Sequence, residues 1–229
     1  MKPYDLSRKI VLITGANSGI GKETAIEFAK ENCIVIISYL KNKEEAHKIA
    51  MKCMDVGARE FFLVKMDVTK NKDIKNAISK IISRYHHIDI LVNNAGVIVW
   101  EPLMKQSLDS ITNQVNVNLS GLMKVTFESL PHVKECIINI ASRAGKIPHA
   151  GLSVYCATKF GVRGFTQTLA LEYPNLRIYA VNPDSTSTKM TNFLGRSPNA
   201  VAKIIVNAAK NNYGVRSGSD VDVWVLSRA

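Results

Sequence analysis

Short apolar runs alternate along the chain with longer stretches in which apolar residues recur every three or four positions. The runs predict strands and the longer stretches predict helices, because side chains repeat every two residues in a strand and every 3.6 residues in a helix. The predicted strands are residues 9–14, 33–39, 61–66, 88–93, 136–141, 177–182 and 221–226. The predicted helices are residues 20–31, 42–56, 71–86, 107–130, 152–172 and 198–211.

The strand runs are apolar on both faces, which is typical of a parallel sheet covered by helices on each side. Strands that alternate with helices also require right-handed crossovers. We therefore expect an α/β fold: a single-domain, doubly wound (Rossmann) seven-stranded parallel sheet with helices on both faces, spanning residues 1–229. In such a sheet, ligands bind at the carboxyl ends of the strands near the switch point.

Composition narrows the functional classes. The net charge is +11, but the basic residues are mixed with acidic ones in amphipathic stretches, which favours solvated helix faces over a nucleic-acid surface. An anionic substrate, cofactor or carrier protein is the alternative. The charged N-terminus is not a signal peptide, and the longest apolar run, 33–40, is far shorter than the roughly 20 residues that span a membrane. We expect a soluble, cytoplasmic protein with no membrane partner.

The four cysteines are widely spaced, with no CxxC pair and no cluster of metal-ligand spacing. They are expected to be free thiols, and no metal site is expected.

A glycine-rich turn follows the first predicted strand. The segment TGANSGIG, residues 14–21, places Gly15, Gly19 and Gly21 at the start of a helix. Glycines let the backbone turn sharply and approach a ligand, and the free amides of a helix start attract a pyrophosphate. This position predicts nucleotide binding.

Polar residues follow three other predicted strands. Asp67 is placed to reach an adenine amino group, Asn93 and Asn94 need paired amides inside an apolar run, and Ser142 lies at the tip after the fifth strand. Each of these residues could serve only to stabilise a turn. However, these three strand ends and the glycine-rich turn after the first strand all meet at one edge of the predicted sheet.

The chain resembles the short-chain dehydrogenase/reductase family from about residue 6 onward, with 3-oxoacyl-acyl-carrier-protein reductases as the nearest pattern. The matching residues are TGANSGIG, Asp67, NNAG at 93–96, Asn118 in VNVNLSG, Ser142, and Tyr155 with Lys159 in YCATK. The resemblance implies that Tyr155 is the general acid/base, Ser142 orients the substrate oxygen and Asn118 holds a water in a proton relay. It also implies that Lys159 binds the nicotinamide ribose and acts on Tyr155.

The resemblance further implies a set of dinucleotide contacts from several segments. They are Gly15, Asn17, Ser18, Gly19, Ile20, Gly21, Tyr39, Lys41, Asp67, Val68, Asn94, Ala95, Gly96, Tyr155, Lys159, Pro183 and Thr188.

Tyr155 and Lys159 share a helix face because they are four residues apart. At about 4 Å and an effective dielectric of about 20, a lysine cation stabilises a phenolate by roughly 4 kcal/mol. The pKa of the tyrosine is then expected to fall from about 10 towards roughly 7.

Two features depart from the family pattern. After the sixth strand, NPDSTST places Asp184 and Thr186 where the family has a glycine and an apolar residue, and the charge of Asp184 is expected to weaken nicotinamide placement. The segment from Thr188 to Pro198 is also short for a substrate lid.

NADP(H) is the expected cofactor, with NAD(H) possible. A carboxylate that would bind the ribose hydroxyls of NAD(H) is missing at the end of the second strand, where Tyr39 stands, and Lys41 and Lys43 lie close by. Ser18 argues against this preference, because many NADP-preferring relatives carry Arg or Lys there.

The expected function is hydride transfer between nicotinamide and a ketone or secondary alcohol, with 3-oxoacyl thioesters among the candidate substrates. The alternatives are a reductase or dehydrogenase of small ketones, sugars or polyols, and a non-catalytic dinucleotide-sensing protein. A homodimer or homotetramer is expected, because helices 107–130 and 152–172 carry more apolar surface than one sheet face can cover.

Overall fold

The computed structural model describes residues 4–226, so both ends of the expected 1–229 domain lie outside the described residues. The strands are β1 (Ile10–Ile13), β2 (Ile34–Tyr39), β3 (Glu60–Lys65), β4 (Ile88–Asn93), β5 (Val133–Ile140), β6 (Arg177–Asn182) and β7 (Asp220–Asp222). The α-helices are α1 (Gly19–Lys30), α2 (Lys43–Asp55), α3 (Asn71–Tyr85), α4 (Leu108–Val115), α5 (Leu122–Ser129), α6 (Ser153–Glu172), α7 (Pro198–Ala209) and α8 (Val223–Leu226). Within residues 4–226, none of the helices is both long enough and apolar enough to cross a membrane.

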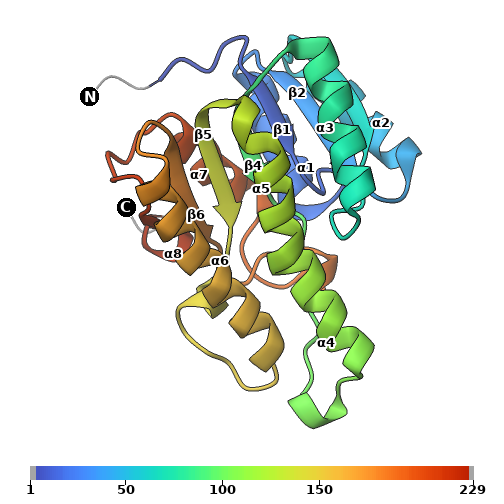
Figure 1. Cartoon of the computed structure of the whole chain (residues 1–229), viewed down its shortest axis with the longest axis vertical. Coiled ribbons are helices and arrows are strands. Elements are labelled where there is room, and N and C mark those ends of the chain that lie inside the picture. Colours follow the sequence, from blue (N-terminus) through green and yellow to red (C-terminus); the bar gives the residue numbers. More distant parts are fainter. Residues whose placement is uncertain (1–3, 227–229) are drawn as a thin grey trace.

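The strands form one seven-stranded parallel sheet in the order β3-β2-β1-β4-β5-β6-β7 (Figure 1). The order reverses between β1 and β4, which creates the switch point where ligands bind in doubly wound folds. The expected seven-stranded parallel sheet is therefore confirmed.

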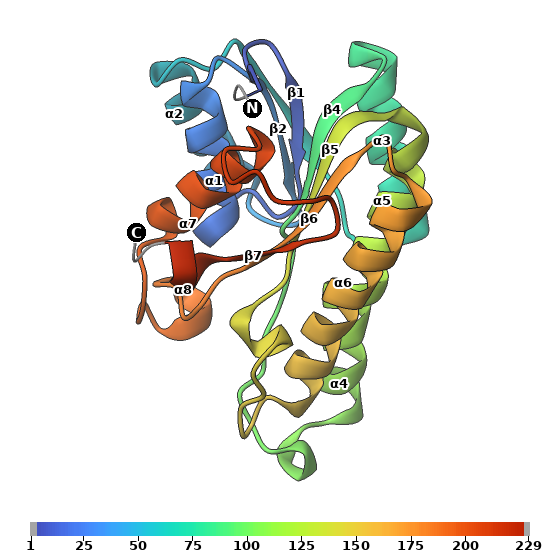
Figure 2. The ribbon, with the colours of Figure 1, turned by 90° about the vertical axis from the view of Figure 1, so that its left-hand side faces the viewer.

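Helices cover both faces of the sheet. In Figure 2, α1, α2 and α7 lie on one side and α3, α5 and α6 on the other. Strand β1 serves both layers, because Val11 and Ile13 face the first set of helices and Ile10 and Leu12 face the second.

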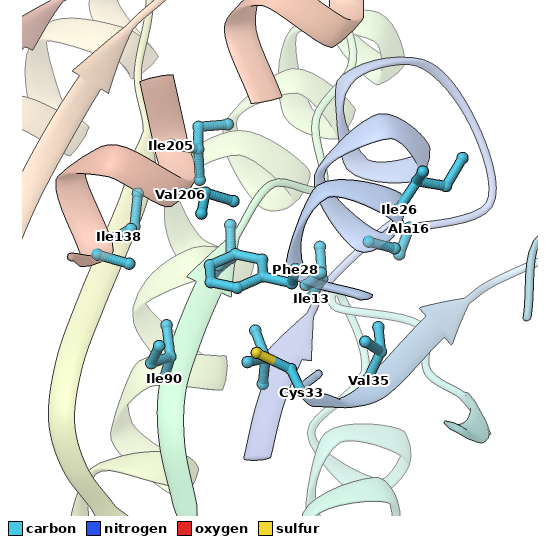
Figure 3. Packing of buried hydrophobic residues seen from close by; sticks show 14 of the residues in the cluster. Ile13, Ala16, Ile26, Phe28, Cys33, Val35, Ile90, Ile138, Ile205 and Val206 are labelled. Carbon is cyan, nitrogen blue, oxygen red and sulfur yellow. The ribbon is translucent and has the colours of Figure 1, made fainter. Parts of the chain in front are cut away.

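The packing on the α1 and α7 side is centred on Phe28 of α1, which lies among the side chains of Ile13, Ile205 and Val206 (Figure 3). Phe28 is fully buried in this layer. All four cysteines are buried as free thiols.

The last predicted strand is shorter than the sequence indicates. The run 221–226 was expected to be extended, but only Asp220–Asp222 pairs with β6, and Val223–Leu226 forms the short helix α8. Strand β6 ends at Asn182 and Pro183 follows, which has no backbone N–H to continue the ladder. The chain after Asp222 therefore satisfies its backbone groups within a helix instead.

The predicted helix 107–130 is interrupted. Between α4 and α5, residues Asn116–Gly121 form a π-helical segment, and a 3₁₀ turn, Leu130–His132, follows α5. π-turns inside helices are rare and occur frequently at functional sites. This one contains Asn118, one of the predicted catalytic residues.

Candidate functional site

The predicted site residues lie at the carboxyl ends of neighbouring strands. Most of them follow β1, β4, β5 and β6, which stand side by side in the sheet and turn their carboxyl ends towards the lower side in Figure 1. Lys41 and Asp67 follow β2 and β3. Segments that are far apart in the sequence therefore converge at the expected edge.

The glycine-rich turn after β1 leaves no room for larger residues. Gly15 and Gly19 have φ angles of 62° and 54°, the left-handed region that favours glycine. A Cβ atom on Gly21 would lie 2.4 Å from Asn94 Nδ2 and 2.6 Å from the Gly15 carbonyl oxygen. The turn is thus pressed against the loop that follows β4.

Hydrogen bonds join these two loops. The amide Nδ2 of Asn94 donates to the carbonyl oxygens of Thr14 (2.9 Å) and Gly15 (3.1 Å). In return, Thr14 Oγ1 accepts from the backbone amides of Asn94 (2.9 Å) and Ala95 (3.0 Å). The Asn94 side chain therefore shapes the glycine turn. Thr14 was not among the predicted site residues, although it is the first polar residue after the apolar run of β1.

The side-chain nitrogen of Asn93 is paired inside the core, whereas its buried Oδ1 has no hydrogen-bond partner among the described residues. Its Nδ2 donates to Thr126 Oγ1 and to Asn139 Oδ1, both at 2.9 Å. Asn139 in turn donates to Thr166 Oγ1 at 2.9 Å. These buried amides connect β4 and β5 with α5 and α6 beneath the site.

Around the glycine turn, the predicted contacts divide into buried and accessible groups. Ile20 packs against the core, and Tyr39 is mostly buried in it. Lys41 is exposed, and its carbonyl oxygen accepts from Asn17 Nδ2 at 2.8 Å. Among the described residues, Ser18 at the start of α1 makes no side-chain capping hydrogen bond.

Asp67 is held in place by its own loop. Its Oδ1 accepts from the backbone amide (3.0 Å) and the hydroxyl (2.7 Å) of Thr69. Burial raises the pKa of Asp67, but the two Thr69 hydrogen bonds and nearby Lys70 together lower it below its ordinary value. Val68 beside it is buried and approaches Gly121 in the π-helical segment.

Ser142, Tyr155 and Lys159 form the centre of the site. Ser142 follows β5 and starts the 3₁₀ turn η4 (Arg143–Gly145), where its Oγ accepts from the Ala144 amide at 3.1 Å. The Tyr155 hydroxyl on α6 lies near the Ser142 side chain, which lowers the pKa of the phenol. Lys159 lies one turn further along α6, with Nζ 5.7 Å from the centre of the Tyr155 ring.

The acidity of this pair differs from the sequence-based expectation. Burial raises the pKa of Tyr155 to about 12, against the lowering effect of the Ser142 hydrogen bond. Burial also lowers the pKa of Lys159 to about 8, and its Nζ donates to the Ile140 carbonyl oxygen at 2.8 Å. Because water is excluded from both groups, both charged forms are disfavoured. The pKa of Tyr155 is therefore not lowered towards 7 in this structure.

Asn118 connects the loop after β4 to α6. Its Oδ1 accepts from the Val97 amide at 2.7 Å, and its Nδ2 donates to the Val97 carbonyl (2.8 Å) and to Thr158 Oγ1 (3.2 Å). Both amide hydrogens are therefore used by protein groups, which leaves none to donate to a relay water. Gly96 lies beside it, since a Cβ there would be 3.4 Å from Asn118 Oδ1.

The Asp184 carboxylate has a partner that the sequence did not reveal. It accepts two hydrogen bonds from Arg196, at 2.9 and 2.8 Å, and these bonds lower the pKa of Asp184 below its ordinary value. The ion pair joins the chain just before the short predicted lid, residues 188–198, to the later part of that lid, and it places a positive charge against the carboxylate that was expected to disturb nicotinamide placement.

The lid reaches the glycine turn. A Cβ on Gly19 would lie 3.2 Å from Thr188 Cγ2, so these two predicted contacts are neighbours. Pro183, which directly follows β6, is buried, and its carbonyl oxygen accepts from the Arg143 amide at 2.8 Å. The predicted residues after β1, β5 and β6 thus surround one site.

Comparisons with known proteins show the family and the fold of the chain. A family model described as short chain dehydrogenase matches residues 9–199. The chain is 33% identical over 192 residues to the 3-oxoacyl-(acyl-carrier-protein) reductase FabG of Staphylococcus epidermidis, covering 81% of this chain and 78% of that protein. It is 35% identical over 192 residues to the protein of the same name from Thermotoga maritima, covering 81% and 77%.

Solved structures share the fold over nearly the whole chain. A variant of a Serratia marcescens short-chain dehydrogenase/reductase superposes with a TM-score of 0.89 at 22% identity, covering 96% of this chain and 97% of that one. A short chain dehydrogenase from Burkholderia cenocepacia, solved in complex with NADP, superposes with a TM-score of 0.88 at 26% identity, again covering 96% and 97%.

Proposed function

Because the chain belongs to the short-chain dehydrogenase/reductase family of oxidoreductases, we propose that it transfers hydride between a nicotinamide dinucleotide and a ketone or secondary alcohol. The observation that carries this proposal is the position of the buried Tyr155 side chain, near Ser142 and one helical turn from Lys159. A 3-oxoacyl thioester is the first candidate substrate, because the curated relatives at 33% and 35% identity are named 3-oxoacyl-acyl-carrier-protein reductases.

The residues around the glycine turn fit a dinucleotide. Because Gly21 has no Cβ, the first turn of α1 lies directly against the Gly15 carbonyl oxygen and the Asn94 side chain. The first-turn amides of a helix attract a phosphate, and here the Ser18 side chain does not cap them within the described residues. When bound, the nicotinamide would supply or accept the hydride. Asp67 and Lys41 would contact the adenosine half.

Within this proposal, Tyr155 donates the proton that a carbonyl oxygen needs as it becomes an alcohol. Burial raises the pKa of its phenol to about 12, so the group is protonated at neutral pH and ready to donate. Ser142, which lies near the same phenol, would hold the substrate oxygen. The protonated phenol is the form that the reductive direction uses, whereas oxidation of an alcohol would need the deprotonated form.

A substrate screen tests the proposed function. The purified protein is mixed with NADPH or NADH and with acetoacetyl thioesters, small diketones or ketoses, and oxidation of the coenzyme is followed. Turnover of thioesters would support the first candidate, and turnover of ketoses or diketones alone would favour the small-ketone alternative. Dinucleotide binding without turnover of any of them would favour a sensing protein.

NADPH is expected to give a higher kcat/KM than NADH on the same substrate. Strand β2 ends in Tyr39 and not in a carboxylate, and Lys41 two residues later is exposed, so a basic group is available there. A charge-assisted bond to a 2′-phosphate, weakened by exposure, contributes on the order of 1 kcal/mol, or roughly fivefold in affinity. Lys41→Ala should therefore weaken NADPH binding about fivefold and NADH binding much less.

The matched control for this prediction is Lys80→Ala, which removes an exposed lysine from α3. It should change neither coenzyme. A kcat/KM ratio that favours NADH in the wild type would contradict the expected preference.

A homodimer or homotetramer is expected in solution. Phe127 on α5 and Leu171 on α6 are 75% and 83% exposed. Phe127 lines a groove of about 470 Å³, and Leu171 directly precedes Glu172, another of its lining residues. The apolar lining of the groove includes Met123, Phe127, Leu130, Phe165, Leu169 and Tyr173. Exposed apolar surface of this kind marks an interaction site, and a two-fold axis would let the same surface cover itself.

Light scattering at micromolar concentration measures this directly. The wild type should show a multiple of 25.3 kDa, whereas Phe127→Glu with Leu171→Glu should shift the protein to the monomer mass. Met51→Glu, at an exposed methionine of α2, is the control and should leave the mass unchanged. A wild-type monomer would contradict the proposal.

A further inference from the structure

The short last strand carries two aspartates that bind groups from three other segments. Asp220 accepts from Arg163 Nε at 2.8 Å and Nη2 at 2.6 Å, so the contact is bidentate. Asp222 accepts from Lys146 Nζ at 2.6 Å. Asn182 Nδ2 donates to both carboxylates, at 3.0 and 2.8 Å. We call these five residues the β7 carboxylate network.

The network holds the far end of the turn that begins at Ser142. The third arm of the Arg163 guanidinium, Nη1, donates to the Gly145 carbonyl oxygen at 2.7 Å. Lys146, the next residue, binds Asp222. At the near end, the Arg143 amide donates to Pro183, which directly follows Asn182. Turn η4 is therefore fixed at both ends by contacts that lead to β6 and β7.

The same turn lies directly against the helix that carries Tyr155 and Lys159. A Cβ on Gly145 would be 2.7 Å from the Lys159 carbonyl oxygen, so the two backbones touch. The Ser142 hydroxyl accepts from the Ala144 amide within η4, and its position follows that turn. A shift of η4 would thus move the Ser142 hydroxyl relative to Tyr155.

We propose that Arg163 and Asp220 are positioning residues for the proposed reaction. They hold turn η4 against helix α6 and so keep the Ser142 hydroxyl beside the Tyr155 hydroxyl. The proposal rests on the proposed function and adds two residues that touch neither substrate nor cofactor. Arginine suits the role because its planar fork binds a carboxylate with two nitrogens and leaves a third for the Gly145 carbonyl.

Both partners are charged at neutral pH. Burial raises the pKa of Asp220, but hydrogen bonds from Arg163 and Asn182 and the charges of Arg163 and Lys146 together lower it below its ordinary value. The hydrogen bond to Asp220 raises the pKa of Arg163 above its ordinary value. The ion pair therefore persists across the pH range of an ordinary assay.

A double-mutant cycle with Ser142 tests the proposal. Asp220→Asn and Arg163→Lys, two mild changes, are each made in the wild type and in Ser142→Ala. In the wild type, each should lower kcat about tenfold or more through misplacement of the reacting groups, with KM for the dinucleotide within about threefold. In the Ser142→Ala background, each should lower kcat by less than about twofold, because the group through which they act is gone.

Amide hydrogen exchange provides a readout that needs no turnover. The amides of Gly145, Lys146 and Ile147 donate to carbonyl oxygens of Ser142 and Arg143 within the turn. They should exchange faster in Asp220→Asn than in the wild type, while the amides of β1 and β4 keep their rates. Arg84→Lys, which alters the Arg84–Glu60 ion pair, is the control and should change neither kcat nor these exchange rates.

The outcomes separate the two proposals. The positioning role would be overturned if Asp220→Asn and Arg163→Lys lowered kcat in the Ser142→Ala background as much as in the wild type. It would also be overturned if the η4 amides exchanged at the same rate in Asp220→Asn as in the wild type. A wild type that turns over none of the screened substrates would contradict the proposed function, and the exchange rates would still show whether the network holds η4.

Discussion

Tyr155→Phe is expected to lower kcat at least about a hundredfold, the lower range for loss of a general acid, while dinucleotide affinity changes little. The phenylalanine ring keeps the packing of Tyr155 against Ala144, Leu152 and Cys156. Only the hydroxyl is lost, and with it the proposed proton donor beside Ser142. The effect should therefore appear in turnover and not in folding or cofactor binding.

Turnover and dinucleotide binding should be measured on one preparation, the first with the best substrate of the screen and the second by titration. Tyr179→Phe is the matched control, since Tyr179 is also a buried tyrosine but lies in the core layer of α1 and α7. It should keep kcat close to that of the wild type. Retained turnover in Tyr155→Phe would remove this residue from the proposed reaction.

Gly21→Ala is expected to reduce the free energy of unfolding by about 1–3 kcal/mol, the range for overpacking a close-packed site. The new methyl group would lie between Asn94 Nδ2 and the Gly15 carbonyl oxygen, which are hydrogen-bonded at 3.1 Å. One of them must move, which separates the glycine turn from the loop after β4. Dinucleotide binding should weaken in the same variant.

Denaturant unfolding measures the stability change, and a dinucleotide titration measures the affinity. Glu23→Ala, also in the first half of α1, introduces the same residue at a half-buried position and should stay within about 0.5 kcal/mol of the wild type. A Gly21→Ala protein with wild-type stability and affinity would show that the turn can relax around the extra carbon.

The sequence was sufficient to predict the layers of the fold and the edge that holds the site. Alternation within IVLI sends Val11 and Ile13 to one face and Ile10 and Leu12 to the other, and this depends only on strand geometry. The positions of Gly15 and Gly19 were also readable, because their left-handed backbone is a local requirement. Polar residues directly after apolar runs identified Asn94 and Ser142, since strand ends in a parallel sheet share an edge.

The sequence could not give contacts that depend on the final distance between segments far apart in the chain. The pairing of Asp184 with Arg196, the bonds from Arg163 to Asp220 and Gly145, and the early end of β7 all depend on which groups meet after the sheet has formed.

The sequence by itself determined the parallel sheet, the glycine turn and the four-residue spacing of Tyr155 and Lys159, because each follows from local backbone geometry or from side-chain periodicity. Only the tertiary structure decided the acidity of that pair. From spacing alone, the lysine charge should lower the pKa of the phenol, but the folded chain excludes water from both groups and directs Lys159 Nζ to the Ile140 carbonyl. Burial is a property of everything packed around a group, so the raised pKa of Tyr155 could be known only once those segments were in place.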